Sequence, residues 1–130
     1  MALTHSWTDP NTGTTYPNAY ARIEAAPLQL KPFPVASLHV AIYRDAAATA
    51  EGRRPVWQST YEIADRPALA HVERAMDGTE TIVVDVPAST AMTDYLLAAS
   101  PAGLPLQVMA TRAYMFLKER RPEFAGWADA

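Results

Sequence analysis

The side chains best suited to acid–base or metal chemistry in this sequence are three histidines, His5, His39 and His71, which lie far apart along the chain. None stands at an HxH or HExxH spacing, which would place two metal ligands on one element. One hypothesis, the third in order after two that are given below, is a small enzyme that uses scattered groups such as His39 and Asp85. Because a half-exposed structural histidine is the commoner role for a residue like His39, the sequence predicts no catalytic residue and no metal site.

Other motifs of catalysis and cofactor binding are absent from the sequence. The serines form no GxSxG or SxxK motif of nucleophilic enzymes. The five glycines form neither GxGxxG nor GxxxxGKS/T, the two common loops that hold phosphate. The lack of cysteine excludes disulfides, thiolate metal sites and cysteine nucleophiles. We therefore predict a protein that is not an enzyme and that needs no cofactor.

Charge and hydropathy exclude further classes. The 130-residue chain has a formal net charge of −3, whereas a general nucleic-acid binder needs a basic surface, so nucleic acid is disfavoured as a partner. No run approaches the roughly 18 apolar residues of a membrane helix, and the N-terminus lacks the basic start and apolar run of an export signal. We expect no membrane contact and a single domain over residues 1–130.

Two basic clusters and two late aromatic residues are the candidates for interaction with a partner. Arg53 and Arg54 form one cluster, and the other ends at Arg121. Each could contact phosphate or an acidic partner, although the helix dipole also accounts for cations at the end of a C-terminal helix. Phe124 and Trp127 stand near the chain end and need an apolar surface, either in their own domain or in a neighbouring subunit. These five residues form the candidate interface.

Eleven prolines divide most of the chain into short segments, which favours strands. The clearest strand is Val35 to Arg44, where alternate residues are apolar, the two-residue period of a half-buried strand. Further strands are expected at residues 20–30, 56–63 and 81–86. The sequence DPNTG at residues 9–13 predicts a hairpin turn.

The most regular helical pattern lies near the C-terminus. Apolar residues recur at helical spacing from Leu106 to Arg121, a proline ends the helix, and residues 122–130 then form a C-terminal extension. A shorter helix is expected within residues 90–99. Residues 45–54 predict a long exposed hairpin loop, with a short helical turn as the alternative.

Residues 65–76 leave two alternatives open. We expect a helix, with Asp65 as its N-cap and Leu69, Val72 and Met76 on one face. The alternative is a strand paired through Asp77-Gly78, because that dipeptide is a strong hairpin signal. With either choice the fold class is α+β, a mainly antiparallel β domain, sandwich-like or barrel-like, with a C-terminal helix and one or two short helices.

Three segments of the sequence resemble a family of small bacteriophage proteins that are encoded among virion structural genes. They are PNAYARIE at residues 17–24, VAIYRD at residues 40–45 and AYMFLKERRPEFAGWAD at residues 113–129. The resemblance covers the two ends of the chain. The middle, residues 45–103, is longer than is typical of the family, and Trp127 and Ala130 replace a smaller residue and a final cysteine.

The resemblance implies a non-enzymatic virion component of the tail, baseplate or neck, or else of the head surface. Its partners would be copies of itself and other virion proteins, and its location would be the virion. The second hypothesis is an independent recognition module for a host or a small ligand, in which Trp57, Tyr61 and Tyr43 line a surface. A small-molecule partner is expected only under this second hypothesis.

Overall fold

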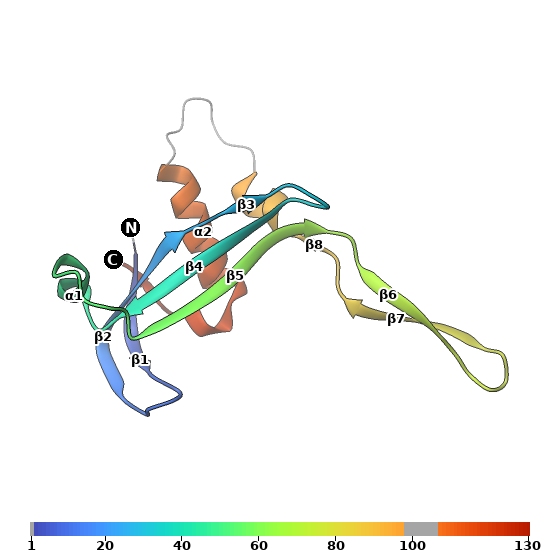
Figure 1. Cartoon of the computed structure of the whole chain (residues 1–130), viewed down its shortest axis with the longest axis horizontal. Coiled ribbons are helices and arrows are strands. Elements are labelled where there is room, and N and C mark those ends of the chain that lie inside the picture. The colour runs from blue at the N-terminus through green and yellow to red at the C-terminus, as the bar shows by residue number, and fades with distance from the viewer. Residues whose placement is uncertain (1, 98–106) are drawn as a thin grey trace.

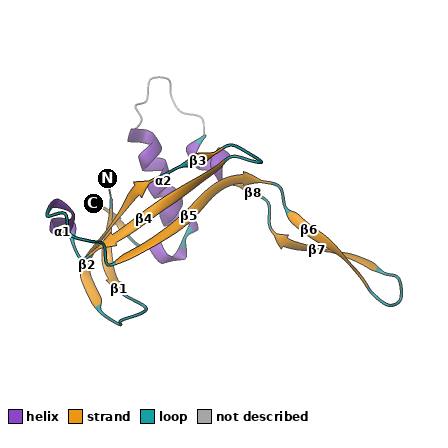
Figure 2. Cartoon of the chain, viewed as in Figure 1, coloured by secondary structure: helices purple, strands orange, loops and turns teal. Residues whose placement is uncertain are grey.

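The computed structural model describes residues 2–97 and 107–130, which form mainly antiparallel strands (Figure 1, Figure 2). Within these residues, one seven-stranded sheet has the order β8-β5-β4-β2-β1-β9, with β3 paired to β4. A separate two-stranded sheet pairs β6 with β7. The strands are β1 Leu3–Thr8, β2 Thr15–Ala25, β3 Leu28–Gln29, β4 Val35–Tyr43, β5 Trp57–Arg66, β6 Leu69–Arg74, β7 Glu80–Val86, β8 Ser89–Thr90 and β9 Ala128–Asp129.

Strand β4 lies at the centre of the large sheet, between β2 and β5. The predicted two-residue period is confirmed, because Leu38, Val40 and Ile42 are all buried in the main core. The opposite side of the strand is also covered at its end, where Ala41 and Tyr43 form a small buried cluster with the short helix α1 (Ala46–Ala50). Burial of one side along the whole strand gives the two-residue period, and burial of both sides is confined to the end of the strand.

The C-terminal helix α2 (Gln107–Arg120) packs on the inner face of the sheet (Figure 1). Tyr114, Phe116 and Leu117 are buried in the same core as the apolar side chains of β4. The hydroxyl of Tyr114 accepts a hydrogen bond of 2.8 Å from the backbone N–H of Ile23, which ties the helix to β2. The helix expected over residues 106–121 is thus present, and residue 106 lies outside the described residues.

A π-helical turn, η1 (Met92–Leu96), packs beside α2. The rings of Tyr95 and Phe116 meet edge to face with their centroids 5.4 Å apart, a favourable aromatic geometry. The short helix expected within residues 90–99 is therefore present at η1, and residues 98 and 99 lie outside the described residues.

The segment after α2 folds back onto its own domain. After a 3-10 turn, η2 (Pro122–Phe124), strand β9 pairs with β1 and covers that edge of the sheet. Phe124 is only 1% exposed and Trp127 6%, and their rings meet edge to face at 5.2 Å. The apolar surface that these two aromatics require is therefore supplied by the same chain. Phe124 and Trp127 were expected to be interface residues, and this assignment is corrected: in the structure they are core residues.

The expected α+β fold class, mainly antiparallel β with a C-terminal helix and short helices, is confirmed. The sheet does not close into a barrel, and α2 covers its inner face in the place that a second large sheet would take in a sandwich. The hairpin turn expected at residues 9–13 joins β1 to β2, where the N–H groups of Gly13 and Asp9 bond the carbonyls of Asp9 and Thr14.

Two local expectations are wrong, and in both the alternative is correct. Residues 45–54 contain the short helix α1, not only an exposed loop, because the Asp45 side chain caps it by accepting a bond of 2.8 Å from the N–H of Ala48. Residues 65–76 form no helix. They contain the end of β5 and strand β6, which turns through Asp77-Gly78 into β7. Gly78 has φ +87°, a conformation that glycine adopts without strain.

The aromatic cluster at the end of the chain should be essential for stability. Phe124→Ala is expected to lower the free energy of unfolding by about 3–5 kcal/mol, because it leaves a cavity between Tyr61 and Trp127. Urea denaturation measures this change. The matched control is Met76→Ala, an apolar truncation at a fully exposed site, which should change stability by less than about 0.5 kcal/mol. Equal effects of the two substitutions would contradict the assignment of Phe124 to the core.

Candidate functional site

The structure divides the predicted interface residues into two groups. Arg53 and Arg54 are exposed on the loop between α1 and β5. Arg121 belongs to the cluster at the end of α2, where its guanidinium lies over the ring of Tyr61 at 5.4 Å and over that of Phe116 at 5.8 Å. Its Nε atom is buried and has no hydrogen-bond partner among the described residues. Arg121 therefore joins Phe124 and Trp127 in a packing role, and Arg53 and Arg54 are the two candidates that are exposed.

The most prominent feature of the surface is the hairpin of β6 and β7, which we call the arm (residues 69–86). It extends beyond the large sheet at one end of the molecule (Figure 1). Every residue of β6 is exposed, as are most residues of β7, and none belongs to the main core. Five of the nine large exposed apolar side chains among the described residues lie on it: Leu69, Val72, Met76, Ile82 and Val84.

The two sides of the arm differ in chemistry. Val72 pairs with Ile82 and Ala70 with Val84, and because directly opposite residues share a side, these four form an apolar face. The other side carries His71, which lies between two carboxylates. The sequence contained a signal for this hairpin in Asp77-Gly78 and the β-branched residues after it, but it gave no sign that the hairpin stands apart from the core.

The histidine on the arm is held by both of its ring nitrogens. Nδ1 lies 2.8 Å from Oδ2 of Asp85 on β7, and Nε2 lies 3.0 Å from Oε1 of Glu73 on the same strand. The hydrogen bond to Asp85, followed by the one to Glu73, raises the pKa of His71 above its ordinary value of 6.5. The contact to Asp85 links the two strands, so the protonated ring stabilises the hairpin.

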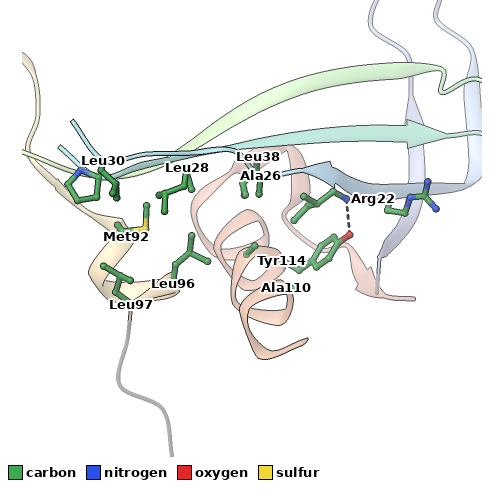
Figure 3. A pocket seen from close by; sticks show the side chains of 14 residues that line it. Arg22, Ala26, Leu28, Leu30, Leu38, Met92, Leu96, Leu97, Ala110 and Tyr114 are labelled. Atoms are coloured by element: carbon green, nitrogen blue, oxygen red, sulfur yellow. Dashed lines mark hydrogen bonds between the residues drawn. The ribbon is translucent and has the colours of Figure 1, made fainter. Parts of the chain in front are cut away.

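A second feature is an apolar cavity of about 600 Å³ between the inner face of the sheet, η1 and α2. Figure 3 shows lining side chains that come from the sheet on one side and from the two helices on the other, among them Leu28, Leu38, Leu96 and Tyr114. Among the described residues of the lining the one charged side chain is that of Arg22, which is paired with Glu24 at 3.0 Å. The sequence does not reveal this cavity, because its lining residues come from five separate segments of the chain.

The geometry gives no support to a catalytic pair at His39 and Asp85. His39 is exposed on β4 and pairs with β2 and β5, whereas Asp85 lies on the arm and binds His71. Across residues 2–97 and 107–130, no group of three or more histidine, aspartate or glutamate side chains is arranged to hold a metal ion. No helix in this part of the chain has the length and apolar character needed to cross a membrane.

Comparison with known proteins returns no similarity. No family model, no curated protein and no solved structure matches the chain. The arm, the cavity and the exposed basic loop are therefore the features of the molecule that bear on its function.

The charge on the arm should respond to pH in a defined direction. Because the pKa of His71 is raised in the folded arm, its stabilising contribution is complete below about pH 6.5, the ordinary histidine pKa, and is lost as the pH rises through the raised value. Titration of the ring by NMR should give a lower pKa in the Asp85→Asn variant. Asp77→Asn is the control, since Asp77 bonds the N–H of Thr79 instead. An unchanged pKa in Asp85→Asn would show that this contact does not form.

Proposed function

We propose that the protein is a non-enzymatic structural subunit that assembles in multiple copies through protein–protein contacts. The observation that carries this proposal is the arm, a two-stranded hairpin that stands apart from the core with apolar residues exposed. An isolated hairpin of two strands is at best marginally stable in water, and three strands or packing against another element are needed for independent stability. Contact with another chain would therefore stabilise the arm more than the rest of the domain.

The apolar face of the arm indicates what such a contact would contribute. Val72, Ile82 and Val84 are 59%, 73% and 55% exposed, and burying an aliphatic side chain fully contributes about 1.5–3 kcal/mol. In the isolated chain this free energy is not realised, and the exposed apolar side chains are an aggregation hazard. A surface of this kind is expected at a site that an assembly covers.

We propose further that the assembly is a phage or phage-like virion, with the tail, baseplate or neck favoured over the head surface. The support is the resemblance of the two ends of the chain to small virion proteins. Residues 17–24 lie in β2, and residues 113–129 form α2 and the returning end, so the shared segments are those that build the body. The partners would be copies of this chain and other virion proteins.

A second function, an independent binding module for a small apolar molecule, is favoured by the cavity. Its volume of about 600 Å³ falls within the range of roughly 300–1,000 Å³ that is typical of ligand pockets. The residues expected to line the surface of such a module, Trp57, Tyr61 and Tyr43, do not lie together on one surface. Tyr43 is buried beside α1, Tyr61 packs against Phe124, and Trp57 packs against Trp7. A monomeric chain that retains an apolar molecule in native mass spectrometry would favour this function.

The arm can be removed without breaking the large sheet, which gives a direct test. Arg66 and Ser89 are opposite each other on β5 and β8, so residues 67–88 can be replaced by an Asn-Gly turn that joins them as a two-residue hairpin. The rest of the domain, residues 2–66 and 89–130, should keep its thermal stability in the shortened chain. Self-association should be lost, as measured by sedimentation velocity. A shortened chain that assembles like the full chain would contradict the proposal.

A further inference from the structure

The formal charge of the chain is concentrated on the arm. Residues 69–86 contain one of the eleven lysine and arginine residues and four of the fourteen aspartate and glutamate residues. The rest of the chain is therefore balanced, with ten of each sign, and the whole net charge of −3 belongs to the arm. A partner surface for the arm should carry a positive charge.

The tip of the arm combines this charge with an apolar side chain. Met76 is fully exposed at the turn, and the nearby carboxylates belong to Glu73, Asp77 and Glu80. Glu80 forms an ion pair with Arg74 across the strands. Glu73 contacts His71, so Asp77 is the one of these carboxylates without an ion pair among the described residues, and the tip is an apolar side chain beside a net negative charge. Methionine is well suited to such a contact, because its flexible side chain adapts to irregular surfaces.

A surface with the matching chemistry lies on the loop that precedes β5. A shallow hollow there is lined by residues 54–58, with Pro55, Val56 and Trp57 as half-buried apolar groups. Arg54 lies at its edge, and no carboxylate among the described residues is within ion-pair distance of it. Arg53, next along the chain, pairs with Glu51 at 2.6 Å. The hollow therefore offers an apolar floor beside a cation that lacks an ionic partner.

The arm and the loop before β5, whose residues line the hollow, lie toward opposite ends of the long axis of the molecule (Figure 1). The tip of a chain's arm therefore cannot reach its own hollow. A contact between them must join two copies through two different surfaces. Such a heterologous contact, repeated from copy to copy, produces a ring if it closes and an open chain if it does not.

We propose that the tip of the arm, with Met76 and its surrounding carboxylates, docks in the hollow beside Arg54 of the next copy, in a head-to-tail assembly. This inference rests on the proposed function, since it names the surface through which the subunits meet. The large apolar cavity fits the tip less well, because its only charged residue is already neutralised by Glu24. A nucleic-acid partner for the arm is excluded by like charge.

A charge exchange between the two surfaces tests the contact. One variant carries Glu73→Lys and Glu80→Lys on the arm, and the other carries Arg53→Glu and Arg54→Glu beside the hollow. All four side chains are exposed, so both variants should fold, which circular dichroism checks. Each variant alone should self-associate at least about tenfold more weakly than the native chain, because like charges then face each other. An equimolar mixture should recover association, since every contact pairs either two native or two reversed surfaces.

A covalent test uses the absence of cysteine from the chain. The double variant Met76→Cys with Gln58→Cys places one thiol at the tip and one at the hollow. Mild oxidation should link it into a ladder of multimers on a non-reducing gel. The control, Met76→Cys with Thr12→Cys, places the second thiol on the exposed β1–β2 turn and should give no ladder beyond dimers.

The outcomes separate this contact from the proposed function. If the native chain assembles, and both charge variants assemble equally well, the contact is wrong and the structural role stands. If each variant is impaired but the mixture does not recover, the arm and the hollow do not meet each other. If the native chain stays monomeric at every concentration, both the contact and the proposed function are overturned. Recovery in the mixture together with the ladder supports both.

Discussion

The apolar contact between the inner face of the sheet and the C-terminal part of the chain is the interaction on which the rest of the structure depends. Leu38 and Ile63 of the sheet and Leu117 of α2 are completely buried in one core with Phe124. Without α2 and the returning end, this face would be open to water, and the edge at β1 would lack its neighbour β9. The end of α2 and the aromatic residues after it therefore serve, first of all, to cover the core and the β1 edge of the sheet.

Because α2 and the end of the chain complete the core, the arm does not contribute to the core of the isolated chain. The main core is complete without any residue of β6 or β7, so the two parts are expected to differ in local stability. The arm is linked to the body through the ends of β5 and β8, where Arg66 and Ser89 pair. The arm has exposed apolar groups, a concentrated charge and little role in the core. These properties are consistent with an element that makes contacts between chains.

The sequence predicts those parts of the fold in which burial imposes a period. Strand β4 and helix α2 were predicted because each buries a regular set of side chains, and the turn at residues 9–13 was predicted from its proline and glycine. The first strand of the arm was expected to be a helix, because Leu69, Val72 and Met76 stand at helical spacing, whereas residues 81–86 were correctly expected to be a strand. In the structure both sides of this hairpin are exposed, so burial does not reinforce the short alternation from Ala70 to Glu73, and the hairpin is signalled by the Asp77-Gly78 turn and the β-branched residues after it.

The candidate site was only partly predictable, for a related reason. Arg53 and Arg54 were identified by residue type, which is enough for an exposed loop. The need of Phe124 and Trp127 for an apolar surface was also evident, but residue type does not reveal whether that surface belongs to the same chain. That depends on the return of the chain to β1, a long-range pairing that no local pattern records. The apolar cavity is likewise built by long-range packing.

Hydrogen exchange measured on the assembled and the dissociated chain tests the central claim most directly, because it reports where backbone hydrogen bonds become protected. Slow exchange is expected in β4 and β5 in both states. Fast exchange is expected in residues 69–86 of the dissociated chain, and strong protection of the same residues is expected after assembly. Equal exchange of the arm in the two states would contradict the claim that the arm is the element that joins the subunits.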